Sequence, residues 1–311
     1  MSTFLTMQQQ EFLVSQRLAT KKVNPETGLV TYKYHRRVMY DYLWDEHPEL
    51  FECRGHTYDP NTGEIVVFPP RKSFNYLENG TWEDVPLDTK VVAFKKFNGF
   101  MACLTIHNGK IIISTTGGTT GPYVKYAEEM LASRISQLKE SLRTLGNNTQ
   151  FHHKSYCSFL YEICHPEDPH IVSEEYGAYY LGIRYNDGDF LPVSTSEHNV
   201  IRGKTLGEIL DICDKNTSIE GFMVYREGDF SDVCKIKTAY YSNMKFLMRM
   251  KDNTVSDMYQ FNNKVNDRIR GSELTKAKWF FIISSIISSF PEWEWKETPE
   301  QDRRKYIETF F

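Results

Sequence analysis

The chain has 311 residues, of which 40% are hydrophobic and 25% are charged, and its formal net charge is −4. This length predicts one large domain with a smaller one, and the composition is typical of an ordinary folded protein. The slightly acidic balance excludes a global basic field, so any contact with nucleic acid has to come from local clusters of cations.

The sequence predicts no membrane or secretory segment. The first ten residues lack the basic-then-apolar order of a signal peptide. The most apolar run, residues 279–290, is interrupted by serines and falls short of the roughly 20 residues that span a bilayer. The six cysteines are scattered without a Cys-x-x-Cys pair, which indicates reduced core thiols in a cytoplasmic protein.

The first quarter of the chain predicts a hairpin flanked by basic loops. Arg36 and Arg37 lie among tyrosines, which indicates either a phosphate-contacting surface or a basic edge. Residues 51–58 and 65–68 are strand-like and are joined by an Asp-Pro-Asn-Thr-Gly turn, with Arg54 at the start of the first strand. Lys72 follows in a proline-stiffened run beside aromatics, suited to holding a phosphate or typical of a surface loop.

Residues 91–104 contain two apolar strand-like runs separated by Lys95, Lys96 and Asn98-Gly99. One interpretation is a hairpin with both lysines solvated at its end, because Asn-Gly is a common hairpin turn. The other places Lys96 against an apolar wall among cations, which would lower its pKa and make it a nucleophile. The local sequence is compatible with both.

The middle of the chain predicts a strand at 110–114, a flexible substrate-side loop at 115–122 and an amphipathic helix at 123–145 ended by Gly146-Asn147-Asn148. The loop lacks the Gly-Lys-Ser/Thr ending of a P-loop. Glu162 is the single charge in a strand at 158–164 and requires a partner, because an isolated buried carboxylate is costly. The neighbouring His and Cys residues fit no zinc spacing: His152, His153, Cys157, Cys164 and His165.

Further strands are expected at 177–185, at 218–225 with Glu220 near its start, and at 233–237 after a turn at 229–232. A short helix is expected at 205–214, and from Tyr240 onward the pattern is helical. Lys235 and Lys237 are two residues apart and share one face of their strand, while Ile236 packs on the other. Two lysines on one face repel each other unless an anion lies between them.

The polar residues isolated in strand settings are Lys96, Glu162, Glu220, Lys235 and Lys237. A nucleophilic lysine, carboxylates and a cationic pair are the groups that nucleotidyl transfer to an amine requires. With these groups, residues 51–241 resemble the covalent nucleotidyltransferases, the superfamily of ATP-dependent ligases and capping enzymes. Within it the chain is similar to the T-even bacteriophage RNA ligase 1 family.

The resemblance assigns roles to the residues around the expected nucleophile. Lys96 of Lys96-Phe97-Asn98-Gly99 matches the motif I lysine that takes AMP, although the family has aspartate where this chain has Asn98. Arg54, in a Glu-Cys-Arg-Gly run, would contact the phosphate or ribose of the nucleotide. Lys72 lies in a run similar to the family's Lys-Phe-Phe-Asn and would line the same site.

The later motifs supply the rest of the implied site. Glu162 matches the ribose-binding glutamate of motif III, and either Tyr179 or Tyr180 matches the motif IIIa aromatic that stacks on adenine. Glu220 matches motif IV, whose acid assists binding of Mg²⁺ or Mn²⁺. Lys235 and Lys237 match motif V, whose lysines contact the α-phosphate and assist catalysis.

The resemblance implies an α+β fold of the nucleotidyltransferase (ATP-grasp-like ligase) type, with antiparallel sheets around the nucleotide pocket and a small all-helical C-terminal domain. Residues 1–241 would form the adenylyltransferase domain and residues 242–311 the helical domain. The implied activity is that of an ATP-dependent RNA ligase of the EC 6.5.1.3 type. It would join 5′-phosphate and 3′-hydroxyl RNA ends through a lysyl-AMP intermediate, and its role would be RNA (tRNA) repair. The protein would be a cytoplasmic monomer, located in the host cytoplasm if it is phage-encoded.

Three alternatives remain. A DNA ligase or an RNA-capping guanylyltransferase would share the lysine chemistry, but both normally carry an OB domain after motif V, where this sequence is helical. A non-catalytic nucleic-acid-binding module would keep the basic and aromatic patches without needing buried Glu162 and Glu220.

Overall fold

The computed structural model describes residues 4–144, 156–168, 170–194 and 196–311. Its strands form three sheets, in which β14 with β5 is the only parallel pair among the described strands. The N-terminal sheet runs in the order β1 (Ala19–Val23), β2 (Val30–Tyr34), β3 (Arg54–Tyr58) and β4 (Ile65–Val67). The antiparallel pairing of β3 with β4 confirms the hairpin expected there.

The other two sheets carry the central and later strands. The β6 sheet has the order β12 (Val200–Thr205), β6 (Lys90–Lys96), β13 (Gly221–Arg226), β14 (Asp229–Lys237) and β5 (Phe74–Asn75). The β7 sheet has the order β11 (Phe190–Pro192), β10 (Gly177–Tyr185), β9 (Cys157–Cys164), β7 (Phe100–His107) and β8 (Lys110–Thr115). This architecture confirms the expected α+β class with mainly antiparallel sheets.

Helices cover one face of each sheet. Helix α1 (Met7–Ser15) packs on the N-terminal sheet, and the short helix α2 (Arg37–Tyr40), between β2 and β3, joins the same core. Helices α3 (Pro122–Met130) and α4 (Ala132–Thr144) pack on the β7 sheet. Helix α5 (Leu206–Lys215) packs on the β6 sheet. Short 3₁₀ turns lie at Pro48–Phe51, Glu78–Gly80 and Glu197–Asn199. One face of each of the two larger sheets is thereby left for other contacts.

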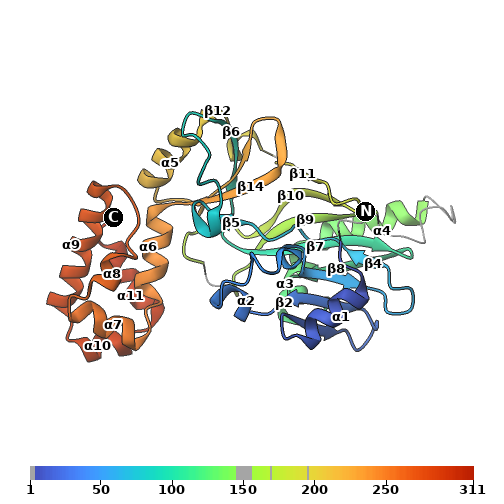
Figure 1. The fold of residues 1–311 in the computed structure, drawn as a ribbon, viewed down its shortest axis with the longest axis horizontal. Helices are drawn as coiled ribbons and strands as arrows, with labels where there is room; N and C mark the ends of the chain where they lie inside the picture. The colour runs from blue at the N-terminus through green and yellow to red at the C-terminus, as the bar shows by residue number, and fades with distance from the viewer. Residues whose placement is uncertain (1–3, 145–155, 169, 195) are drawn as a thin grey trace.

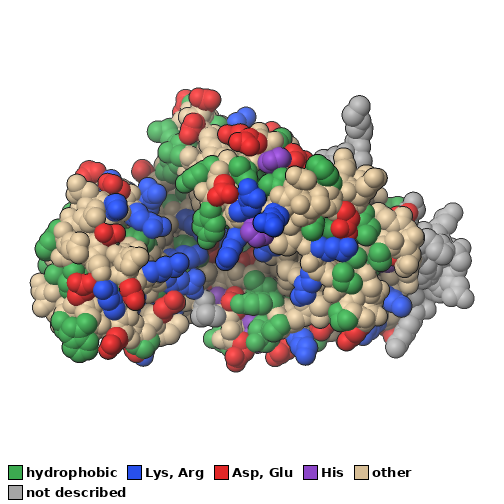
Figure 2. Space-filling view, turned by 60° about the horizontal axis from the view of Figure 1, so that its bottom comes forward, with side chains coloured by type: hydrophobic (Ala, Val, Ile, Leu, Met, Phe, Trp, Pro, Cys, Tyr) green, Lys and Arg blue, Asp and Glu red, His purple; other side chains and the backbone are tan. Residues whose placement is uncertain are grey.

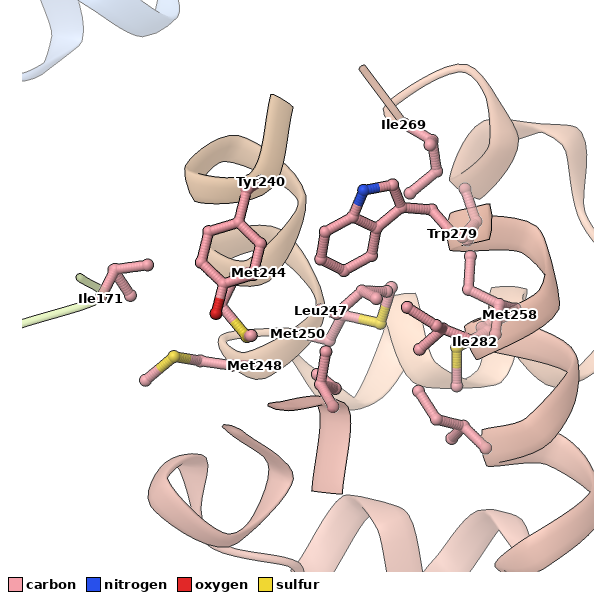
Figure 3. Packing of buried hydrophobic residues seen from close by; sticks show 14 of the residues in the cluster. Ile171, Tyr240, Met244, Leu247, Met248, Met250, Met258, Ile269, Trp279 and Ile282 are labelled. Carbon is pink, nitrogen blue, oxygen red and sulfur yellow. The ribbon is translucent and has the colours of Figure 1, made fainter. Parts of the chain in front are cut away.

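The C-terminal part is entirely helical, as expected. It contains α6 (Ala239–Met248), α7 (Asp252–Tyr259), α8 (Asn263–Asn266), α9 (Glu273–Ser289), α10 (Glu292–Glu297) and α11 (Glu300–Glu308). Figure 1 shows these helices, in orange and red, gathered at one end of the molecule beside the sheets. They enclose a core of their own, which includes Tyr240, Met244, Trp279 and Ile282 (Figure 3). Since α6 begins at Ala239, a helix spans the domain boundary proposed at residue 241.

Two local expectations differ from the structure, and others lie outside the described residues. The helix expected at 123–145 is two helices, because Leu131 leaves the helical conformation; its side chain is buried in the cluster that α3 shares with the β7 sheet. The turn expected at 229–232 lies instead at residues 227–228, where Gly228 supplies the positive φ of 81°. The helix end expected at Gly146-Asn147-Asn148, and His152 and His153, lie outside the described residues.

The loop at 115–122 is hydrogen-bonded to residues at the end of β1, and its expected flexibility stays a prediction. Lys22 Nζ in β1 donates to the Thr120 carbonyl at 2.8 Å, and Asn24 Nδ2 donates to Thr119 Oγ1 at 2.9 Å. These contacts tie the loop to the N-terminal sheet. The cysteines were correctly expected in the core, since five of the six free thiols are buried. No described helix has the length and hydropathy to cross a membrane.

Candidate active site

Lys96 lies where the chain crosses from one sheet to another. It is the last residue of β6, and the chain enters the β7 sheet at Phe100. β6 pairs with β12 and β13, whereas β7 pairs with β8 and β9, so the hairpin interpretation of this stretch is wrong. Gly99 is required for close approach, because a Cβ atom there would collide with the Ile163 carbonyl of β9. The Asn-Gly pair therefore marks a crossover rather than a turn.

Glu220 lies between two lysines from neighbouring strands. Gly221 of β13 is opposite Lys96 of β6 on one side and opposite Lys237 of β14 on the other. The preceding carboxylate is thus placed between them, with Oε2 3.1 Å from Lys96 Nζ and Oε1 3.0 Å from Lys237 Nζ. The Glu220 side chain is only 4% exposed, so both ion pairs are largely shielded from water. This carboxylate therefore joins Lys237 of β14 to Lys96 of β6, and not to Lys235.

Glu162 completes the surroundings of Lys96 from the second sheet. Its Oε1 accepts the Gly99 N–H at 3.2 Å, and the charge of Lys96 acts on it directly. Burial, which Lys96 only partly offsets, raises the pKa of Glu162. The partner that the sequence left unknown is therefore the loop of residues 97–99 that follows Lys96.

The pKa of Lys96 differs from the expectation. Burial of the ammonium works to lower it, but the negative charges of Glu162 and Glu220 outweigh burial, and the pKa of Lys96 lies above its ordinary value. Correspondingly, burial works to raise the pKa of Glu220, but Lys96 and Lys237 hold it below its ordinary value. The expected lowering of the Lys96 pKa was wrong, because two carboxylates from remote strands lie next to this lysine. A lysine whose pKa is raised keeps its proton at neutral pH.

Lys235 and Lys72 both have pKa values below that of an ordinary lysine. Burial, together with Lys72 and Lys237, lowers the pKa of Lys235 to about 7. Burial also lowers the pKa of Lys72 to about 8, with Arg54 acting in the same direction. Lys72 Nζ lies 3.8 Å from the centre of the Phe74 ring. These cations crowd one another, which is the arrangement expected of a site that receives several phosphate charges.

The register of the β7 sheet separates the two candidate tyrosines. Tyr179 is paired with Glu162 across β10 and β9, and directly opposite residues share a face of the sheet. Tyr180 is paired with Tyr161 and packs in the core cluster below α3, on the other face. Tyr179 stacks on Phe97, with ring centres 4.0 Å apart and an angle of 16°. Tyr179 therefore lies on the same side of the sheet as Glu162 and against Phe97.

No protein-family model matches this chain. A curated protein of Thermovibrio ammonificans described as "Putative RNA ligase" is 24% identical over 263 residues, covering 79% of this chain and 66% of that protein. An "Archaeal ATP-dependent RNA ligase" structure has a TM-score of 0.51 at 14% identity, covering 97% of this chain and 75% of its own. A "Putative ATP-dependent DNA ligase from Aquifex aeolicus" has a TM-score of 0.51 at 12% identity, covering 97% and 78%.

The chain has the nucleotidyltransferase fold of ATP-dependent ligases. Each of the sheets of this ligase fold contributes to the site. The N-terminal sheet supplies Arg54; the β7 sheet supplies Glu162 and Tyr179; the β6 sheet and the segment before it supply Lys72, Lys96, Glu220, Lys235 and Lys237. Tyr180 points to a different face of its sheet and does not join them.

Asn98, also named from the sequence, is hydrogen-bonded to the segment between β9 and β10. It is 7% exposed, its Nδ2 donates to the Val172 carbonyl at 3.2 Å, and its N–H donates to Glu174 Oε1 at 3.4 Å. An aspartate would place a carboxylate oxygen against that carbonyl. The ligand-free structure thus gives a local reason for asparagine here, and a direct nucleotide contact of Asn98 remains a prediction.

Two further residues of α6 join the site, and neither was singled out from the sequence. Lys237 Nζ lies 4.8 Å from the centre of the Tyr241 ring, and Lys245 Nζ lies 5.5 Å from it on the same helix. Lys245 Nζ also approaches the Tyr241 hydroxyl at 3.5 Å. The four-residue spacing on a helix that directly follows the motif V strand is the signal that could have found them. Figure 2 shows Lys and Arg side chains on both sides of the hollow between the helical part and the sheets.

A divalent metal ion would find oxygen ligands at Glu162 and Glu220, which are close enough for the charge of Glu220 to raise the pKa of Glu162. Within the described ranges no three His, Cys, Asp or Glu side chains form a metal-binding group. Mg²⁺ is commonly held by one or two carboxylates together with waters and substrate phosphates. The pair therefore fits a metal ion that binds together with a nucleotide.

Proposed function

We propose that this protein is an ATP-dependent RNA ligase that works through a covalent lysyl-AMP on Lys96. The observation that carries the proposal is the Lys96 amine held between buried Glu162 and Glu220, next to Lys237, at the crossover between two sheets. A single hairpin lysine would need none of these groups. The relatives described as RNA ligases support RNA as the substrate.

The first step is attack of Lys96 Nζ on the α-phosphorus of ATP. A nitrogen–phosphorus bond forms, the bond from the α-phosphorus to the bridging oxygen breaks, and pyrophosphate leaves. Because Lys96 is protonated in the ligand-free protein, it has to lose a proton before attack, and the arrival of neutralising charge at Glu162 and Glu220 would lower its pKa. Mg²⁺, held by these carboxylates and the phosphates, would supply that charge.

The remaining steps are two further displacements. A 5′-phosphate oxygen of one RNA end attacks the adenylate and releases the Lys96 amine, and a 3′-hydroxyl then attacks the 5′-phosphorus and releases AMP. Lys235 and Lys237 neutralise charge on the phosphate oxygens, and Arg54 and Lys72 bind the phosphates. Adenine would stack on the face of Tyr179 opposite Phe97, while Glu162 accepts from the ribose hydroxyls.

The finer proposals concern the substrate. We propose the RNA ligase 1 type of the family and a role in RNA (tRNA) repair, with the protein acting as a monomer and residues 1–241 forming the adenylyltransferase domain. A DNA ligase is the second candidate, because a structural neighbour with the same TM-score is described as one. A preference for RNA or DNA ends decides between them.

The first experiment is incubation with ATP labelled at the α-phosphate and Mg²⁺, followed by denaturation and gel electrophoresis. We expect the wild type and Lys90→Ala to retain label and Lys96→Ala to retain none. Lys90 is the matched control, since it lies on the same strand, at the opposite end from the carboxylates. The proposal fails if the wild type holds no label from ATP, and label from GTP instead would favour a capping enzyme.

The second experiment offers 5′-phosphorylated single-stranded RNA and DNA of one sequence to the adenylylated protein. Sealing of RNA in preference to DNA is the expected result. Preferential sealing of the DNA would replace the RNA ligase proposal with the DNA ligase one. Size-exclusion chromatography with light scattering tests the monomer.

A further inference from the structure

A short segment between β9 and β10 connects the C-terminal helices to residues 97–99, which follow the proposed nucleophile Lys96 and are called the nucleophile loop. This segment, residues 170–175, is called the strap here. Figure 3 shows Ile171, on its own ribbon, pointing toward Tyr240, Met244 and Met248 of α6. The strap thus contacts the helical core although it belongs, by sequence, to the middle of the chain.

The helical side of the strap is well anchored. Ile171 and Val172 are 2% and 5% exposed and belong to the same apolar cluster as the helices from α6 to α11. Arg304 of α11 adds a hydrogen bond from its Nη1 to the His170 carbonyl at 2.6 Å. Burial of these two branched apolar side chains stabilises the contact. The strap is therefore packed as part of the helical core.

The other side of the strap holds the residues on both sides of Lys96. Glu174 Oε2 accepts from Lys95 Nζ at 2.8 Å, and Oε1 accepts the Asn98 N–H at 3.4 Å. The Val172 carbonyl accepts from Asn98 Nδ2 at 3.2 Å. The Glu174 side chain is 4% exposed, and a shielded charge pair is both strong and geometrically demanding.

We propose that the strap makes the C-terminal helices part of the machinery that positions Lys96, with Glu174 as the positioning residue. Lys95 and Asn98 flank the nucleophile, so fixing them fixes the path of the backbone that carries Lys96. The same strap bonds the Tyr179 hydroxyl, through the Glu175 carbonyl at 2.8 Å. A displacement of α6 or α11 is transmitted to the nucleophile loop through these bonds. The consequence for reaction rate rests on the proposed function, whereas the mechanical link does not.

Hydrogen exchange in the ligand-free protein tests the link without any assumption about activity. Arg304→Gln removes the hydrogen bond to the His170 carbonyl, and the amides of Asn98 and Gly99 are expected to exchange faster although they lie far from residue 304 in sequence. Glu308→Gln is the matched control, since it breaks the ion pair of Arg304 within α11 and leaves the strap bond in place. Unchanged exchange at residues 98 and 99 in Arg304→Gln would overturn the proposal.

The kinetic test uses single-turnover labelling of Lys96 with ATP. Glu174→Gln is expected to reduce the adenylylation rate constant about tenfold with little change in the ATP concentration at half-maximal rate, because positioning rather than binding is lost. Glu175→Gln is the control, since that exposed residue takes part only through its backbone carbonyl. Lys95→Met breaks the same ion pair from the other side and replaces Glu174→Gln should that variant not fold.

The outcomes separate the two proposals. Equal rate constants for Glu174→Gln and Glu175→Gln would refute the positioning role. Absence of label in the wild type would refute the proposed function, while the exchange experiment would still decide whether the strap couples the helices to the loop.

Discussion

Replacing Asn98 by aspartate, which is the usual residue at this position of motif I in the family that the sequence resembles, is expected to destabilise this protein. The side chain is 7% exposed and its Nδ2 donates to the Val172 carbonyl at 3.2 Å. An ionised aspartate would lose that bond, oppose a carbonyl with a carboxylate oxygen, and add a negative charge beside Glu174. An unmade buried hydrogen bond and a buried like charge together cost roughly 2–4 kcal/mol in free energy of unfolding.

The penalty has a characteristic pH dependence. Burial and Glu174 would raise the pKa of the introduced carboxyl in the folded state above its unfolded value, so the folded state binds the extra proton. The loss of stability in Asn98→Asp is therefore largest near neutral pH and shrinks as the pH falls through that raised pKa, because a protonated carboxyl can donate to the Val172 carbonyl.

Urea unfolding at pH 7.5 and pH 5 measures both effects against the wild type at the same pH. Asn263→Asp is the control, since Asn263 is exposed at the start of α8 and its replacement should change stability by less than about 0.5 kcal/mol. Equal stability of Asn98→Asp and the wild type at pH 7.5 would refute the reasoning. So would a penalty that is the same at both pH values, since it would not come from the charge.

Three further results are expected. Glu220→Gln should lower the pKa of Lys96, because it removes one of the two carboxylates that raise this pKa. A lysine-modifying reagent should then label Lys96 at lower pH than in the wild type, as mapped by mass spectrometry. An unchanged pH dependence of labelling would contradict this. Lys235→Met should be more stable than the wild type at pH 6, because the folded wild type then buries a charged Lys235. The difference in free energy of unfolding should shrink from pH 7 upward, since folded Lys235 loses its proton near pH 7 while the unfolded chain keeps it. A difference that does not change with pH would count against this. Tyr179→Leu should weaken ATP binding by the roughly 1–3 kcal/mol of a base stack, whereas Tyr180→Leu should mainly lower stability; the reverse pattern, in binding and melting assays, would exchange their roles.

The strands and their faces could be predicted from the sequence because they depend on local alternation. Lys235 and Lys237 share one face of β14, and Ile236 is buried on the other with α5, as expected. The alternation also required Tyr179 and Tyr180 to point in opposite directions. Which of them faces Glu162 depends on the pairing of β10 with β9, which alternation alone does not specify.

The sequence by itself determined that Lys96, Glu162 and Glu220 are charged residues in strand settings, since the unfavourable burial of a lone charge is visible in the apolar residues around it. Tertiary structure decided their relations: the crossover at Gly99, the carboxylate of Glu220 shared by two lysines, and hence a raised pKa for Lys96 where a lowered one was expected. It alone revealed the strap, whose Glu174 is distant in sequence from the loop it holds. The physical reason is that a pKa and a loop position depend on charges and hydrogen bonds between strands remote along the chain, and only the packing of the sheets and helices brings these together.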